Sequence, residues 1–294
     1  VYYCGWFFHD LPANNGLLET MEWEFPDDAM INAQGEAPTS LAPFTQTCFA
    51  HGVFLVGARM SYALDPLRAV AAWYQGLGAP VFGGVNKWNE PMADISPELN
   101  ATGGGARPDM DGVDGAGAYF ATMSDCSDVE TTESDRPFLY LVRNYFKSSY
   151  GHGKFRGGAG VGFSLMMHHV PWVAMGAFGY GSKYPSTLGV FGGYAAPTTL
   201  VRTVEGSNVK ALLSEGKQSM PHNLDEIYGT ENPEEGHESF HHICMGVRPV
   251  VNGDTFAFLV GGGAGYGDAL ERDPENVLMD LRDGMTTSWA ARNV

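Results

Sequence analysis

Residues 148–160 read SSYGHGKFRGGAG and follow a strand-like run, so three basic or titratable side chains stand among glycines. The three are His152, Lys154 and Arg156. Glycine has no Cβ, and its backbone lets another segment or a ligand approach closely. The stretch therefore predicts polar groups on a tightly turned, closely packed backbone; the alternative is a turn whose charges face water. Glycine-rich blocks at 103–105 and 261–267 favour the packed interpretation.

The composition predicts a packed protein that is rich in loops. At 294 residues and 31.7 kDa, the chain is long enough for one large domain or two, with a hydrophobic core. Its 39 glycines and 17 prolines make up about a fifth of all residues, above the usual share of about 12%. They follow no Gly-X-Y period, which excludes collagen. A packed chain of this composition should contain extended segments that lie close together.

The charge and the cysteines exclude several kinds of partner and location. A formal net charge of −17 argues against nucleic acid and anionic membranes, because both require a basic surface. The four cysteines are far apart and form no CxxC pair, which favours free thiols in a reducing compartment and predicts a cytoplasmic protein. No apolar run is long enough to span a membrane. The apolar start VYYCGWFF predicts that a missing part of the polypeptide or a partner subunit covers residues 1–8.

Three helices are predicted. Residues 43–62 carry apolar side chains at mostly helical spacing, although two glycines weaken the pattern. Asp65 followed by proline is typical of a helix start and predicts a second helix that runs to Gly76 or Gly78. Asp273, also followed by proline and then by one apolar face, predicts a third helix near the end of the chain.

The remaining pattern predicts a mixed α/β fold that is rich in β-structure, with few helices and with glycine-rich extended segments of polyproline-II-like form. Strands are predicted at 138–146, 161–169, 247–251 and 255–260. Residues 1–135 should form an irregular and helical part, and residues 136–294 a β-rich part with a terminal helix. The acidic stretch 205–240 is predicted to be a surface insertion.

Several polar residues are candidates for a site. Arg107, among glycines, could clamp a carboxylate or phosphate, or form a structural ion pair with Asp109 or Asp111. His51 is interpreted as a core histidine rather than a ligand. His168 and His169 are adjacent in a predicted strand, so their side chains should point to opposite faces and could not readily share one metal.

One stretch matches a metal-site motif. Residues 237–241 read HESFH, the HExxH pattern that binds zinc when it lies on a helix. Pro233 and Gly236 stand just upstream and make a long helix doubtful, so we interpret these histidines as adventitious or structural. No dinucleotide-binding glycine pattern, phosphate-binding loop or nucleophile elbow is present.

Four blocks together resemble the hydantoinase B and 5-oxoprolinase family, in that family's order. The blocks are PDDAMIN at 26–32 with AP at 37–38, GGARP at 104–108 with Asp111-Gly112, GHGKFRGG at 151–158, and GGGAGYGDALERDPE at 261–275. The last block departs from the family pattern at Ala264 and at Ala269. Within the family, the chain is more similar to the ketone carboxylases for acetone and acetophenone than to the amidohydrolases. It resembles only the C-terminal part of such a subunit.

The resemblance implies one part of a multi-subunit, ATP-dependent ketone carboxylase, which lines the site where the activated ketone enolate meets CO₂ or bicarbonate. It implies ATP and Mg²⁺ on a hydantoinase A-like ATPase partner. It implies a divalent metal (Mn, Zn or Fe) on a missing N-terminal half or on a partner, with no metal ligand in this chain, and also a small accessory subunit. The alternatives are an ATP-dependent hydrolase of cyclic amides, as in hydantoinases and 5-oxoprolinases, and a non-catalytic scaffold segment.

For the residues of the site, we expect His152, Lys154 and Arg156 to act in catalysis. Arg107 and Asp111 are expected to bind the substrate. The cations could stabilise negative charge that develops on an enolate or carboxylate. His152 could transfer a proton, because the ordinary pKa of histidine is near neutral.

Overall fold

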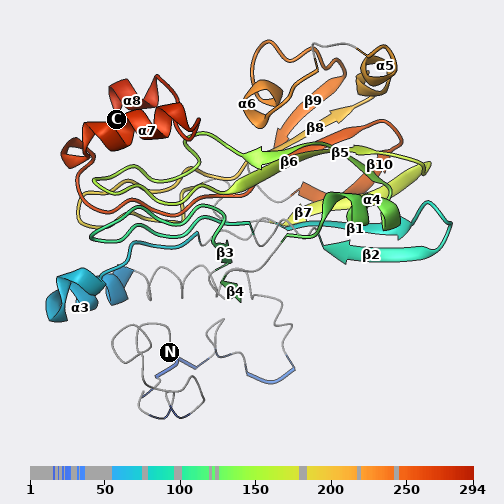
Figure 1. Ribbon diagram of the computed structural model, residues 1–294. Coiled ribbons are helices and arrows are strands. Elements are labelled where there is room, and N and C mark those ends of the chain that lie inside the picture. The colour runs from blue at the N-terminus through green and yellow to red at the C-terminus, as the bar shows by residue number, and fades with distance from the viewer. Residues whose placement is uncertain are drawn as a thin grey trace.

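The computed structural model in Figure 1 describes most of the chain from residue 55 onward. It describes residues 55–294 except 75–78, 96–100, 119–120, 123–125, 179–183, 217–219 and 242–244, and before them residues 16, 19, 22, 24–27, 32 and 34–36. Most of the predicted helix 43–62, including His51, therefore lies outside the described residues. The apolar start at residues 1–8 lies outside them too.

Two antiparallel sheets and few helices dominate the described part, which confirms the predicted fold class. The four-stranded sheet has the order β10-β7-β1-β2, and the five-stranded sheet the order β5-β6-β11-β8-β9. The strands are β1 Ala79–Val85, β2 Pro91–Ile95, β5 Phe138–Tyr145, β6 Val161–Met167, β7 Trp172–Phe178, β8 Val201–Glu205, β9 His237–His241, β10 Met245–Val251 and β11 Thr255–Leu259. A short pair, β3 Gly117–Ala118 and β4 Ala121–Thr122, stands apart.

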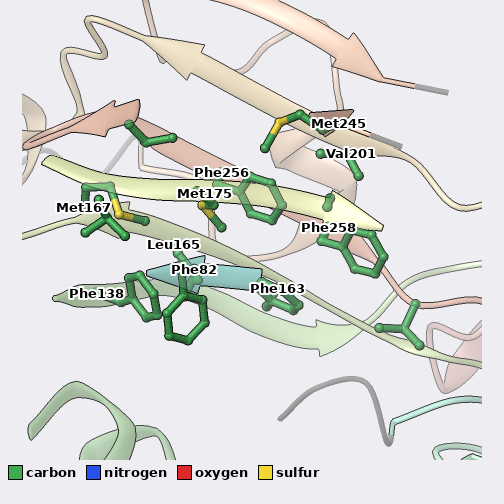
Figure 2. Packing of buried hydrophobic residues seen from close by; sticks show 14 of the residues in the cluster. Phe82, Phe138, Phe163, Leu165, Met167, Met175, Val201, Met245, Phe256 and Phe258 are labelled. Carbon is green, nitrogen blue, oxygen red and sulfur yellow. The ribbon is translucent and has the colours of Figure 1, made fainter. Parts of the chain in front are cut away.

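The main hydrophobic core is built from side chains of both sheets (Figure 2). Phe163 of β6 is fully buried and lies beside Phe256 and Phe258 of β11, with ring centroids 6.4 and 5.9 Å away. From the other sheet, Phe82 of β1 meets Phe138 of β5 edge to face at 4.5 Å. Because alternate residues of a strand face opposite sides, β11 also contributes a second face, which packs under the insertion helices.

The helices are short. They are α3 Gly57–Leu64, α4 Val129–Asp135, α5 Val209–Ser214, α6 Leu224–Ile227, α7 Pro274–Arg282 and α8 Ala290–Asn293. The predicted terminal helix is confirmed as α7: the Asp273 side chain accepts a hydrogen bond from the Glu275 amide, and Pro274 occupies the first turn. None of the helices formed by the described residues is long and apolar enough to cross a membrane.

The predicted helix from Asp65 to Gly76 or Gly78 is wrong beyond its first turn. Asp65 does cap a helix, but only the single 3-10 turn Pro66–Arg68. Residues 69–74 are instead extended, and all but the half-buried Trp73 are buried. The amide of Ala71 donates to the carbonyl of Ala106 at 2.8 Å, so pairing with a distant glycine-rich segment replaces the local helical hydrogen bonds.

The predicted strands are confirmed, with two corrections around them. Residues 247–251 and 255–260 do form strands, but β10 and β11 belong to different sheets. The stretch 205–240 is more than a surface insertion, because its end enters β9, the edge strand that pairs with β8. The hairpin of β1 and β2 lies in a region whose sequence shows little periodicity, and sequence analysis missed it.

Extended segments without strand assignment form a third structural unit, which we call the glycine bundle. Its segments are 69–74, 101–107, 111–117, 148–160, 187–196 and 260–267. They run side by side between the sheets and helices α3 and α7 (Figure 1). Backbone hydrogen bonds join them: Gly158 donates to Gly104 at 2.8 Å, and Gly263 donates to Gly158 at 2.8 Å.

Consecutive glycines in the bundle face different neighbours. A Cβ on Gly103 would lie 1.9 Å from the carbonyl oxygen of Gly158, and one on Gly105 would lie 1.9 Å from that of Ala71. Gly104, between them, faces Ala116 instead. Three directions in three residues is the period of a polyproline II helix, so each segment can be packed by neighbours on all sides when glycine leaves room.

Candidate functional site

The turns of the glycine bundle gather at the end that lies away from the sheets. Residues 107–110 form one such turn, closed by a hydrogen bond from the Arg107 amide to the Met110 carbonyl. Phe155 and Tyr266 pair at another, and Arg272 donates to the Lys154 carbonyl at 3.2 Å. Arg107 and Asp111 lie in or beside the first of these turns, and the segment that carries His152, Lys154 and Arg156 is joined to it by a hydrogen bond from the Arg156 amide to the Asp111 side chain at 2.8 Å.

Five charged side chains form a partly buried ion network at this end. Arg156 donates from Nε to Asp280 at 2.8 Å, and its Nη1 and Nη2 reach both oxygens of Asp114 at 2.8 and 3.2 Å. Arg272 binds both oxygens of Asp111 at 2.8 Å each and the second oxygen of Asp280 at 2.7 Å. Asp280 of α7 thus joins two arginines that stand on different segments, and the network holds the turns to the terminal helix.

The network keeps its arginines charged. Burial acts to lower the pKa of Arg156, but hydrogen bonds and charges of Asp114 and Asp280 outweigh it and raise that pKa above its ordinary value. The same balance, with Asp111 and Asp280 as partners, raises the pKa of Arg272. The guanidinium carbon of Arg156 also lies 4.6 Å from the ring centre of Tyr150. Arg156 is therefore occupied on its edges and on one face.

His152 stands beside the network. Its ring centre lies 5.2 Å from that of Tyr150, and its backbone carbonyl accepts a hydrogen bond from the backbone amide of Tyr194 at 2.7 Å. Burial lowers the pKa of His152, and the positive charge of Arg272 lowers it further. Near pH 7 the imidazole is consequently neutral and can accept a proton.

Lys154 and Arg107 are left out of the network. Lys154 is exposed and makes an ion pair with Glu271 at 3.4 Å. Arg107 is half-buried, and within the described part of the chain its guanidinium shows no ion pair or side-chain hydrogen bond. Asp111, which sequence analysis offered as a partner for Arg107, binds Arg272 instead. Arg107 is thus available for an anionic ligand, and Lys154 could bind one by leaving its exposed partner Glu271.

The structure brings together residues that sequence analysis did not connect. It places Asp111 and Arg156 in one network, with His152 beside it. Sequence analysis missed Arg272, Asp114 and Asp280, the other members. Arg272 lies in the closing glycine block, and this position was the sequence feature that could have identified it. For Asp280, the sequence shows no such feature beyond its place on a predicted helix.

The structure shows the arrangement of two histidine-containing motifs that sequence analysis had singled out. Residues 237–241 form strand β9 rather than a helix, which confirms that HESFH is not a helical zinc motif; its Glu238 pairs with Arg202. His168 and His169 follow β6, and their ring centres are 3.7 Å apart, so the expectation of opposite faces is wrong. His169 has a φ of 63°, which turns its side chain back onto its neighbour.

A divalent metal does not fit the described residues. Among them, no group of three or more His, Cys, Asp or Glu side chains is arranged to hold an ion. The carboxylates of the ion network are already matched with arginines.

The profile of the hydantoinase B/oxoprolinase family matches residues 1–269, which include the glycine blocks that meet at this site. The chain belongs to this family. It is 32% identical over its whole length to the acetophenone carboxylase delta subunit of Aromatoleum aromaticum, of which it covers 43%. It is 26% identical to the caprolactamase subunit beta of Pseudomonas jessenii, where the match covers 96% of this chain and 44% of the relative.

A solved structure supports the assignment to the family. The nucleotide-free structure of acetone carboxylase superposes with a TM-score of 0.73 at 27% identity, over 80% of this chain and 31% of that one. The chain thus spans less than half the length of the family relatives that it matches.

Proposed function

We propose that the chain is part of a multi-subunit, ATP-dependent ketone carboxylase of the acetone or acetophenone type. The observation that carries the proposal is the 32% identity over the whole chain to an acetophenone carboxylase subunit, together with a fold similar to acetone carboxylase. In this proposal, the end of the glycine bundle lines the site where the ketone enolate meets CO₂ or bicarbonate. ATP with Mg²⁺, and the divalent metal, belong to partner polypeptides.

The available cations have the clearest chemical role. An enolate and a new carboxylate both carry negative charge, and fixed cations in a site sheltered from water stabilise such charge. Lys154 and Arg107 are placed to do this because neither is held in the ion network. His152, with its lowered pKa, is proposed to accept the proton that leaves the ketone.

Arg156 and Asp111 have most of their hydrogen-bonding capacity filled by other residues. We propose that they act by holding the turns that present Arg107 and Lys154. The sequence-based prediction that Arg156 is catalytic and that Asp111 binds substrate stays a prediction, to be decided by whether their conservative variants change turnover or only stability.

The proposed partners are a hydantoinase A-like ATPase, an N-terminal hydantoinase B-like half or chain, and a small accessory subunit. The support is that the chain spans less than half of its relatives and that those relatives are named as subunits. We further propose that the complex acts in the cytoplasm. The four cysteines of the chain are far apart and form no CxxC pair, which suits a reducing compartment.

The test is ketone-dependent incorporation of labelled bicarbonate by the assembled complex in the presence of ATP. Lys154→Ala and Arg107→Ala should each reduce incorporation by about 100-fold or more, as for loss of one charge-stabilising donor. Both should leave the melting temperature of the chain unchanged. Lys210→Ala, which removes an exposed lysine of α5, is the matched control and should keep full activity.

A second function, ATP-dependent ring opening of a cyclic amide, is favoured by the similarity to the caprolactamase subunit. Lactam or hydantoin hydrolysis without bicarbonate incorporation would establish it in place of carboxylation. Full activity of both Lys154→Ala and Arg107→Ala would instead favour a scaffold without catalytic groups.

A further inference from the structure

The strand register of the four-stranded sheet separates its side chains into two faces. Phe82 of β1 is paired with Met175 of β7, and both point into the core between the sheets. Val250 of β10 and Met92 of β2 join them on that inner face. Successive residues of a strand point to opposite faces of the sheet. The residues that neighbour these four along their own strands therefore point outward.

Among the described residues, the outer face carries no charged side chain and, apart from the indole N–H of Trp172, no polar side-chain group. It consists of Pro91, Ala93 and Ile95 of β2, Val81, Gly83 and Val85 of β1, Trp172, Ala174 and Gly176 of β7, and Val247, Pro249 and Val251 of β10. An antiparallel sheet with one face in water normally carries polar residues on that face. We call these twelve residues the apolar face.

The apolar face is open. Trp172 is 51% exposed, Val247 62% and Ile95 50%, which are large values for such side chains. The five-stranded sheet differs: helix α6 of the insertion covers its outer side (Figure 1), and Leu224 and Ile227 pack there against Leu259. One sheet is covered by this chain's own insertion, and the other has no such cover within the described residues.

The shape of the apolar face suits close contact with another polypeptide. A row of small residues, Ala93, Gly83 and Ala174, runs across three paired strands at its centre. Larger side chains flank the row, among them Val247 on one side and Trp172 on the other. Apolar side chains from a partner could fill the central row while its own backbone stays close to the sheet.

We propose that the apolar face is a docking surface for the part of a hydantoinase B-type subunit that lies beyond the region matched here. The identity of the occupant rests on the proposed function, whereas the exposure of the apolar face is independent of it. The chain covers 43% and 44% of two relatives, so a family subunit has more than half of its length beyond the part matched here. An uncharged, apolar surface is typical of an interface that is permanent.

A second copy of this chain is a poorer occupant. Each copy carries a net charge of −17, so two copies repel each other as they approach. The apolar face has no charged group that could offset this repulsion by pairing across the interface. A partner of lower negative charge would bind the same face without that cost.

The experiment uses this chain and the polypeptide from the same source that carries the remaining part of the family subunit, purified together and separately. Ala174→Arg places a long cation at the centre of the apolar face and should weaken the complex at least 100-fold. Ala174→Ser, the matched control, should change the affinity less than threefold. Both isolated variants should melt as the parent chain does.

A second measurement does not depend on how the arginine variant folds. Val247→Cys should react with a charged thiol reagent at least tenfold more slowly in the complex than in the isolated chain, measured at that peptide by mass spectrometry. Leu213→Cys, an exposed position on α5 outside the apolar face, should react equally fast in the complex and in the isolated chain.

Three results would overturn the inference. They are equal reactivity of Val247→Cys in the complex, a stable dimer of the isolated chain that protects this cysteine, and failure of the two polypeptides to associate. Bicarbonate incorporation by the same complex is a separate readout. A carboxylating complex with an unprotected face refutes the docking surface alone, whereas a protected face without carboxylation refutes the proposed function alone.

Discussion

The glycine bundle and the sheet sandwich are packed in opposite ways. In the sandwich, backbones stay apart and large side chains such as Phe163 and Phe256 fill the space between them. In the bundle, backbones touch directly, and a Cβ on Gly263 would lie 1.8 Å from the carbonyl oxygen of Gly104. Side chains can shift to other rotamers, but two backbones in contact cannot. The bundle should therefore tolerate far less change than the sandwich.

The largest effect is expected for Gly263→Ala. Its new methyl group would overlap the backbone of Gly104, so two segments would have to separate, and we expect a loss of more than about 5 kcal/mol in the free energy of unfolding. Gly246→Ala is the matched control, because no atom lies within 4 Å of that Cβ. Chemical denaturation of both variants checks the difference; similar stability of the two would show that the bundle is not tightly packed.

Phe163→Ala should come next. Phe163 is fully buried between aromatic rings of β11 and β5, and its removal leaves a cavity in the sandwich that costs about 3–5 kcal/mol. Phe163→Leu keeps most of the volume and should cost about 1.5 kcal/mol or less. Urea unfolding of the pair measures whether the sandwich responds in proportion to volume. An equal loss in both variants would contradict that graded response.

Asp280→Asn tests the ion network that closes the bundle. The change removes one charge between Arg156 and Arg272, leaves two buried arginines undercompensated, and should cost about 2–3 kcal/mol. The control, Asp225→Asn, breaks the more exposed pair with Lys147 and should cost less than about 1 kcal/mol. Thermal melts at one pH and salt concentration suffice. Equal shifts would mean that the network does not hold α7 in place.

The smallest effect concerns the pH dependence of stability. Because burial lowers the pKa of folded His152, the unfolded chain binds a proton at higher pH than the folded chain. Its contribution is complete above the unfolded pKa, about 6.5, and is lost as the pH falls from there through the folded pKa. His152→Gln should flatten this part of the profile between about pH 7 and pH 5.

His168→Gln provides a comparison for this profile, because burial also lowers the pKa of His168 in the sandwich region. Each single variant should remove part of the slope, and the double variant should remove more than either. Unfolding in urea at several pH values provides the measurement. An unchanged slope in His152→Gln would show that this imidazole is not shielded as the structure indicates.

The sequence predicted the bundle better than it predicted the sheets. Glycine blocks and the cap at Asp273 report local backbone requirements, and these are visible in a single chain. The hairpin of β1 and β2 was missed because its outer residues are apolar, so the alternation that marks a half-buried strand is absent. The early end of the helix after Asp65 was missed because a distant segment competes for the backbone hydrogen bonds of residues 69–74.

The candidate site was predicted in part. Its residues stand in conspicuous glycine blocks, and that drew attention to His152, Lys154, Arg156, Arg107 and Asp111. Which carboxylate meets which arginine depends on how three distant segments come together. No spacing in the sequence encodes that Arg156 selects Asp114 and Asp280, or that Asp111 selects Arg272.

The position of residues 260–267 inside the bundle has a consequence for synthesis of the protein. This segment forms hydrogen bonds with four earlier segments, through Ala72, Gly103, Gly158 and Tyr194, yet it leaves the ribosome after all of them. The backbone amides and carbonyls of the earlier segments that bond to residues 260–267 must therefore stay without these partners until this segment emerges. Translation speed and chaperone access while this segment is being synthesised should consequently govern the yield of native molecules.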